Sequence, residues 1–206
     1  TLQGSTPITL ELTALLDVNC YLGRSQFTQD PHFLGSLEEF RVYRGARSAA
    51  QLAASFAAGP DVTNAGTNYC GQAVPNSTGQ RGSIFASGSE SASLGVLSLS
   101  ASRLPTSSFG FFLVSQVQGF VPQPGGSQGN LCLGTPIGRY VGPGQIKNSG
   151  ASGSFALVLD LAATPQPNGF VTVTTGQTWN FQCWHRDAVG GVATSNFTNA
   201  VSLTFQ

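Results

Sequence analysis

The chain has 206 residues, of which 40% are hydrophobic and only 9% are charged, against about 25% charged residues in an average soluble protein. The formal net charge is zero, which argues against a nucleic-acid partner because phosphate binding needs a basic surface. No apolar run approaches the roughly 18 residues of a membrane-spanning helix. A weakly charged chain rich in Ser, Thr, Gly and Asn is typical of an extracellular β-protein, and low charge also favours association between copies.

The first 60 residues are dominated by strand signals. Apolar and β-branched or aromatic residues predict strands over 8–16, 18–22 and 35–43. A single helix is expected over 48–58, because Ser48 is a suitable N-cap, alanines favour helix and Gly59-Pro60 would end it. This part of the chain therefore predicts β-structure followed by one short helix.

Two motifs in this region resemble the closing strands of a laminin-G-like (concanavalin A-like) jelly roll. They are Tyr21-Leu22-Gly23-Arg24-Ser25 and the segment from Phe33 to Tyr43. The resemblance implies that residues 1–60 are the C-terminal portion of such a jelly roll. A complete one needs about two to three times that length. The chain also has no methionine. We therefore expect a piece of a longer polypeptide, or a half-fold that another chain completes.

A short polar linker is expected over 61–67, followed by a second domain over 68–206. Short strands alternate there with turns rich in Gly, Ser and Pro, and no helical pattern intervenes. This arrangement predicts an antiparallel β-sandwich, so that the fold class of the whole chain is all-β. The expected strands are 83–86, 96–101, 110–116, 137–140, 155–161, 178–185 and 200–205.

The second domain carries a resemblance of its own. It is similar to a C-terminal β-domain of very large secreted or surface proteins of environmental bacteria. The similarity implies an extracellular location but no activity. The residues that carry it include Asn68-Tyr69-Cys70, Leu131-Cys132-Leu133-Gly134, Phe181-Gln182-Cys183-Trp184 and Ser195 through Phe205.

The four cysteines, Cys20, Cys70, Cys132 and Cys183, are widely spaced. None forms a CxxC pair and no His/Cys cluster has zinc-ligand spacing, so a metal site is not expected. In a β-rich chain of low charge they predict disulfides formed in an oxidising compartment. We favour Cys70–Cys132, with Cys20–Cys183 as a tie between the two halves. The alternative of four buried free thiols stays open, because spacing does not decide the pairing.

No catalytic residue is predicted. The triplet His185-Arg186-Asp187 resembles a kinase catalytic loop, but Val192 stands where that motif needs an Asn. We expect Arg186 and Asp187 to pair at a strand end and His185 to face solvent.

Paired carboxylates for glycoside hydrolysis are also not expected. Glu38 and Glu39 are the one close pair, and adjacent residues of a strand point to opposite faces of the sheet. The sequence therefore predicts a non-catalytic protein.

Two segments hold candidate ligand or interface residues. Trp184, next to His185 and Arg186, is expected to be an interface or second-core residue, with a sugar-stacking platform as the alternative. The loop 25–32 holds Asp30 and His32. Asp30 is its only acid, whereas calcium prefers six or more oxygen ligands, so calcium is kept only as an alternative cofactor.

The incomplete jelly roll suggests the function. A half-sandwich has unpaired sheet edges, and a strand from a neighbouring copy or from the rest of the parent polypeptide would satisfy them. We therefore expect a non-catalytic assembly or adhesion module of a bacterial cell surface, with Thr1 to Leu10 as the candidate donated strand. The alternative is a lectin-like module that binds carbohydrate or protein.

Overall fold

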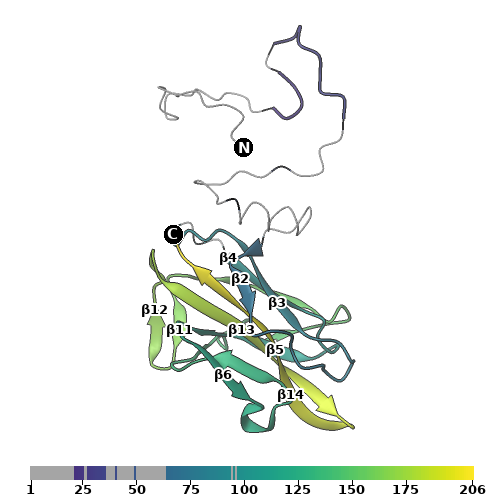
Figure 1. Cartoon of the computed structure of the whole chain (residues 1–206), viewed down its shortest axis with the longest axis vertical. Coiled ribbons are helices and arrows are strands. Elements are labelled where there is room, and N and C mark those ends of the chain that lie inside the picture. Colours follow the sequence, from purple (N-terminus) through teal and green to yellow (C-terminus); the bar gives the residue numbers. More distant parts are fainter. Residues whose placement is uncertain are drawn as a thin grey trace. The chain divides into compact units, whose positions relative to one another are not determined.

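The structure is a computed structural model that describes residues 21–25, 27–35, 40, 49, 64–93, 95 and 97–206 (Figure 1). The chain divides into two units, residues 1–44 and 45–206. The predicted strands over 8–16 and 35–43 lie outside the described residues except for Gly35 and Phe40, and the helix predicted over 48–58 does so except for Ala49.

In the first unit, the described residues form bends and a turn. The Phe33 N–H donates to the Gly23 carbonyl at 2.8 Å, and the Asp30 N–H donates to the Phe27 carbonyl at 3.3 Å. Tyr21 and Leu22 were expected to end a strand over 18–22, yet neither lies in a strand. No neighbouring strand among the described residues satisfies their backbone groups, as a strand would require.

The second unit is an antiparallel β-structure. Its strands are β1 (Asn64–Ala65), β2 (Thr67–Tyr69), β3 (Ser83–Gly88), β4 (Leu97–Ser102), β5 (Phe109–Ser115), β6 (Gln118–Pro122), β7 (Asn130–Leu133), β8 (Gly138–Arg139), β9 (Lys147–Asn148), β10 (Phe155–Leu159), β11 (Thr164–Gln166), β12 (Gly169–Val171), β13 (Thr178–Val189) and β14 (Val192–Thr204). A 3-10 helix, η2 (Pro124–Gly126), follows β6. The strands begin at residue 64, inside the segment expected as a linker.

Two larger sheets form the sandwich. One has the order β1-β3-β4-β10, and the other runs β2-β14-β13-β5-β8, with β9 also pairing with β5. Two hairpins, β6–β7 and β11–β12, form small sheets of their own. All pairings are antiparallel, so the predicted all-β antiparallel fold class is confirmed.

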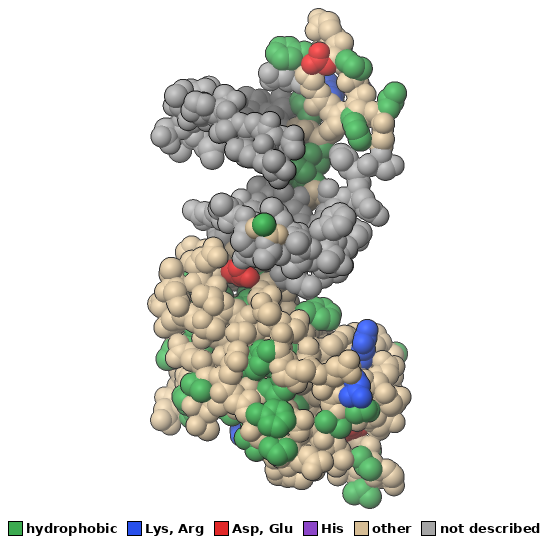
Figure 2. Space-filling view, viewed as in Figure 1, with side chains coloured by type: hydrophobic (Ala, Val, Ile, Leu, Met, Phe, Trp, Pro, Cys, Tyr) green, Lys and Arg blue, Asp and Glu red, His purple; other side chains and the backbone are tan. Residues whose placement is uncertain are grey.

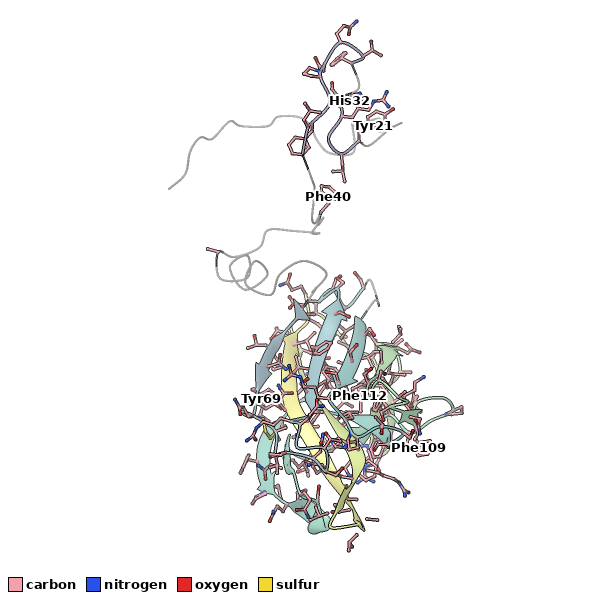
Figure 3. The ribbon with its side chains drawn as sticks, turned by 90° about the vertical axis from the view of Figure 1, so that its right-hand side faces the viewer. Tyr21, His32, Phe40, Tyr69, Phe109 and Phe112 are labelled. Carbon is pink, nitrogen blue, oxygen red and sulfur yellow. A yellow bond between two sulfur atoms is a disulfide. The ribbon has the colours of Figure 1, made fainter. Side chains whose placement is uncertain are left out.

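The core lies between the two larger sheets. In β4, Leu97, Leu99 and Ala101 are buried, while the serines between them are less buried, as the alternating sequence predicts. Phe112 of β5 is fully buried in this core, and Phe109, at the start of the same strand, is 51% exposed (Figure 3). Period-two alternation therefore explains which face of each sheet is interior.

The hairpin of β13 and β14 is the longest element and is buried on both faces. Trp179, Phe181 and Cys183 of β13 enter the core between the sheets. On the other face, Leu113, Leu133 and Phe197 form a second cluster, because the β6–β7 hairpin covers that side. The turn between the strands is Gly190-Gly191, and both glycines have positive φ, which a tight two-residue hairpin turn requires.

Candidate functional site

A cleft of about 350 Å³ opens at the end of the six-stranded sheet. It is formed where β8, the loop that follows it and the β11–β12 hairpin meet. Polar and apolar side chains share its wall, and one of them is charged. The lining residues are Arg139, Val141, Gly142, Gln145, Pro165, Gln166, Gly169 and Phe170.

Close packing of β8 against β11 shapes this cleft. Gly138 is buried, and a Cβ at this position would collide with the Pro165 carbonyl oxygen, so a larger residue would push the hairpin away. Because side chains alternate along a strand, the next residue, Arg139, is exposed, whereas Tyr140 after it is buried. The glycine thus allows the hairpin to approach a strand whose guanidinium group lines the cleft.

Two glutamine side chains in the cleft are held by local hydrogen bonds. The Gln145 carbonyl oxygen Oε1 accepts the Gly142 N–H at 2.9 Å, and Gln166 Nε2 donates to the Pro165 carbonyl at 3.0 Å. The Gln145 Nε2 group and the Gln166 Oε1 atom have no partner among the described residues. The cleft therefore offers both hydrogen-bond donors and acceptors.

Phe170 of β12 gives the cleft an aromatic surface. Its side chain is 70% exposed, although an aromatic ring of this size is normally at least half-buried. Val141, on the loop after β8, is also exposed. An exposed ring beside amides and a guanidinium is a suitable surface for a ligand with one apolar face and several polar groups.

Two buried hydroxyl groups lie next to the cleft residues in sequence. Tyr140 follows Arg139 and Thr164 precedes Pro165, and neither hydroxyl makes a hydrogen bond of good geometry among the described residues. Burial raises the pKa of Tyr140, while the neighbouring Thr164 hydroxyl lowers it and the Asp160 carboxylate raises it further. Tyr140 therefore stays neutral at physiological pH.

His185 does not face solvent, contrary to the prediction. Its side chain is 0% exposed, because β14 lies beside this part of β13 and Gly82 lies against the Nε2 side of the ring. Its Nδ1 atom lies 3.1 Å from the Arg186 carbonyl, and Nε2 has no partner. Burial lowers the pKa of His185. The ring is an interior group and is not placed to bind a ligand.

Asp187 does not pair with Arg186 either. Neighbouring residues of β13 point to opposite faces, so Arg186 is exposed while Asp187 is buried. The Asp187 carboxylate accepts the Ser77 N–H at 3.0 Å and the Asn196 amide at 3.2 Å. These bonds lower its pKa although burial acts in the opposite direction. Asp187 fastens the loop at Ser77 to the long hairpin.

Trp184 belongs to the second cluster. Its ring lies 4.9 Å from that of Phe111, and the side chain is half-buried among Leu131 and Ile137. The sugar-platform alternative is not supported for this residue, because the ring is engaged in packing against its neighbours.

Asp30 and His32 are both exposed in the turn of the first unit. In the same unit the Arg24 guanidinium carbon lies 4.8 Å from the centroid of the Tyr21 ring. No group of three or more His, Cys, Asp or Glu side chains among the described residues is arranged to hold a metal ion. The described part of the chain also contains no helix with the length and apolar character needed to cross a membrane.

Cys70 and Cys132 form a disulfide, as favoured from the sequence. It joins the end of β2 to β7. Cys183 is a free thiol, fully buried in the core between the sheets. The predicted Cys20–Cys183 tie is therefore wrong, because the Cys183 side chain points into the core. Burial also raises the pKa of this thiol, which keeps it protonated.

Sequence reasoning missed the residues of the cleft. Arg139 falls in the strand predicted over 137–140, but no site was assigned to it. Gln145 and Gln166 lie in segments with no alternating pattern, so no strand face could be assigned to them. Phe170 left the clearest signal, since it is a large aromatic residue directly after Asn168-Gly169, a dipeptide typical of a tight turn.

Comparison with known proteins gives no assignment. No family model matches the sequence, and no curated protein or solved structure matches it significantly. The antiparallel sandwich is compatible with a jelly roll, but the two resemblances remain predictions.

Proposed function

We propose that this chain is a non-catalytic structural module of an extracellular or cell-surface assembly, and that copies associate by adding strands to one another. The observation that carries the proposal is the edge of the four-stranded sheet at β10. This strand pairs with β4 on one side, and no described strand pairs with it on the other.

The β10 edge lacks the usual features that block strand addition. Natural edge strands carry lysines, prolines or bulges that prevent further pairing. The sequence of β10 is Phe-Ala-Leu-Val-Leu, with no charge and no proline, and its pairing with β4 runs without a bulge. Val158, on its outer face, is 72% exposed. An uncharged apolar edge favours pairing with another strand.

A second copy of the chain is the partner that fits this edge. Two antiparallel β10 strands would pair through a two-fold axis and would join two four-stranded sheets into one. The net charge of zero means that copies do not repel one another. Charged side chains are also sparse on the face of the second unit seen in Figure 2.

Native mass measurement tests this proposal. We expect the unreduced chain to form dimers or larger species in light scattering as its concentration rises. The variant Val158→Lys places a charge on the edge strand and should shift the population toward the monomer. The matched control is Val192→Lys, because Val192 is also 72% exposed but begins β14 at the tip of the long hairpin.

A monomer at all accessible concentrations would refute the proposal, as would an equal effect of both lysine variants. Deletion of Thr1–Thr9 is a separate arm. It asks whether the predicted donated strand, which lies outside the described residues, contributes to the association. If the chain without residues 1–9 still associates through β10, only the predicted role of these residues as a donated strand is refuted.

The chemistry of the described residues supports the non-catalytic part of the proposal. General acid–base catalysis needs a titratable group within reach of a substrate. His185 is enclosed in the interior, and the Asp187 carboxylate accepts hydrogen bonds from the Ser77 N–H and the Asn196 amide. The disulfide between Cys70 and Cys132 supports the extracellular location, because such bonds persist in oxidising compartments.

A second candidate function is carbohydrate binding, and the cleft favours it. A solvent-exposed Phe170 beside Gln145 and Gln166 combines a flat apolar surface with amide groups. Binding of any oligosaccharide that depends on Phe170 would support this function.

A further inference from the structure

The charge in the cleft at β8 is unusual for this chain. Arg139 is the only charged residue that lines it, and its side chain is exposed. It makes no ion pair and no side-chain hydrogen bond with any described residue. The Asp160 carboxylate acts on the neighbouring Tyr140, but it accepts the Ala162 N–H and does not line the cleft. The guanidinium therefore remains available to a ligand.

An arginine side chain is suited to binding oxyanions. Its planar fork of N–H donors matches a carboxylate or a phosphate, which it can bind through two parallel hydrogen bonds. The chain as a whole has no excess of positive charge, so a single guanidinium in a cleft does not suggest a polyanion such as nucleic acid. One carboxylate per bound unit is the charge that fits.

The remaining groups of the cleft suit hydroxyls and a ring. The Gln145 amide nitrogen is free to donate, and the Gln166 carbonyl oxygen is free to accept, because local bonds occupy the opposite atom or one N–H of each side chain. Sugar hydroxyls are both donors and acceptors. The exposed Phe170 ring offers a surface for the C–H face of a pyranose.

We propose that this cleft binds an acidic sugar, with its carboxylate on Arg139, its hydroxyls on Gln145 and Gln166, and one face of its ring on Phe170. The proposal rests on the second candidate function, carbohydrate binding, and is independent of self-association through β10. It adds the class of ligand, a uronic-acid-containing oligosaccharide.

A panel of oligosaccharides tests the proposal with the whole 206-residue chain. Oligomers of galacturonate, glucuronate and mannuronate are compared with the neutral oligomers of galactose, glucose and mannose. Binding is measured on an array, and the dissociation constant of the best ligand is then determined by calorimetry. We expect an acidic oligomer to bind at least about tenfold more tightly than its neutral counterpart, as expected for a charge-assisted pair.

Two variants locate the binding in the cleft. Arg139→Gln should weaken the acidic ligand about tenfold or more and bring it to the level of the neutral one. Phe170→Ala should weaken both ligands. The matched controls are Arg186→Gln, an exposed arginine of β13, and Phe120→Ala, whose ring is 64% exposed on β6. Both should bind as the unchanged chain does, and the thermal midpoint of each variant shows whether it is folded.

The outcomes separate the two ideas. Equal binding of acidic and neutral oligomers, lost with Phe170→Ala but not with Arg139→Gln, would overturn the acidic ligand and keep carbohydrate binding. An equal loss with Arg186→Gln would overturn the site, because it would indicate unspecific attraction. No binding by any member of the panel would overturn both the ligand class and the second candidate function.

Discussion

Removal of the Cys70–Cys132 disulfide is expected to destabilise the second unit strongly. The bond closes a loop with a sequence separation of 62 residues. In the chain-entropy treatment, such a cross-link removes about 14 cal/mol/K from the unfolded ensemble, which is about 4 kcal/mol at about 25 °C. For a domain of about 140 residues, a loss of this size lowers the melting temperature by about 14 °C.

The perturbation is the double variant Cys70→Ala/Cys132→Ala. Cys70 has a positive φ of 74°, but Ala and Cys share the same cost there, so the substitution leaves the backbone penalty unchanged. The Tyr69 hydroxyl still donates to the Cys132 carbonyl at 2.9 Å, which preserves one contact between β2 and β7. The expected effect therefore comes mainly from the unfolded state.

Urea unfolding measures this effect, with the oxidised chain and the variant compared in the presence and absence of a reductant. Reductant should destabilise the original chain and leave the variant unchanged. Cys183→Ala is the control, because it removes a buried thiol that is not part of the disulfide. A loss of less than about 1 kcal/mol in the double variant would refute the reasoning and would mean that the unfolded chain is already compact.

Four further predictions concern three polar side chains and one glycine. Burial lowers the pKa of His185, so as the pH falls the imidazole binds a proton in the unfolded chain before it does so in the folded chain. The free energy of unfolding should therefore be constant above about pH 6.5 and decrease below it, and His185→Gln should flatten this dependence in urea titrations at several pH values. Burial raises the pKa of Tyr69 to about 12, so as the pH rises the phenol loses its proton in the unfolded chain first, and the free energy of unfolding should decrease from about pH 10 upward. Tyr69→Phe should reduce this decrease, and ultraviolet titration of the phenolate checks the pKa. Gln182 bonds to three backbone groups at 2.8–2.9 Å, and Gln182→Met should cost about 3 kcal/mol in calorimetric melting, since buried partners would be left unsatisfied. Gly138→Ala should destabilise the fold and open the cleft, because the new methyl group would collide with the Pro165 carbonyl; a thermal midpoint equal to that of the unchanged chain would contradict this.

The alternating segments of the sequence were sufficient to predict the sandwich. Leu97-Ser98-Leu99-Ser100 has one apolar face and one polar face, and the structure buries the leucines. The pattern fails where a strand is buried on both sides. Gln182 looks like an outward-facing residue, but Cys132 and Asn130 of β7 bond to its amide and bury it, and no local pattern reports such a covering layer.

The cleft could not be predicted from the sequence for a different reason. It depends on β8 and β11, which contain two and three residues, and on the close approach of Gly138 to Pro165 across the fold. Elements so short have no periodicity, and their position is decided by packing between segments that are distant in the sequence. The Cys70–Cys132 pairing was favoured among three possible connectivities, but the spacing of the cysteines did not decide it, and only the structure selects it.

The position of β14 has a consequence for the synthesis of the protein. This strand lies between β2 and β13, and the Asn68 amide bonds to the Ala200 carbonyl across 132 residues. A growing polypeptide that has not yet reached β14 therefore lacks the strand that joins β2 to β13 in its largest sheet and leaves apolar faces uncovered. Premature stops before residue 192 should yield targets for chaperones and proteases instead of smaller folded domains.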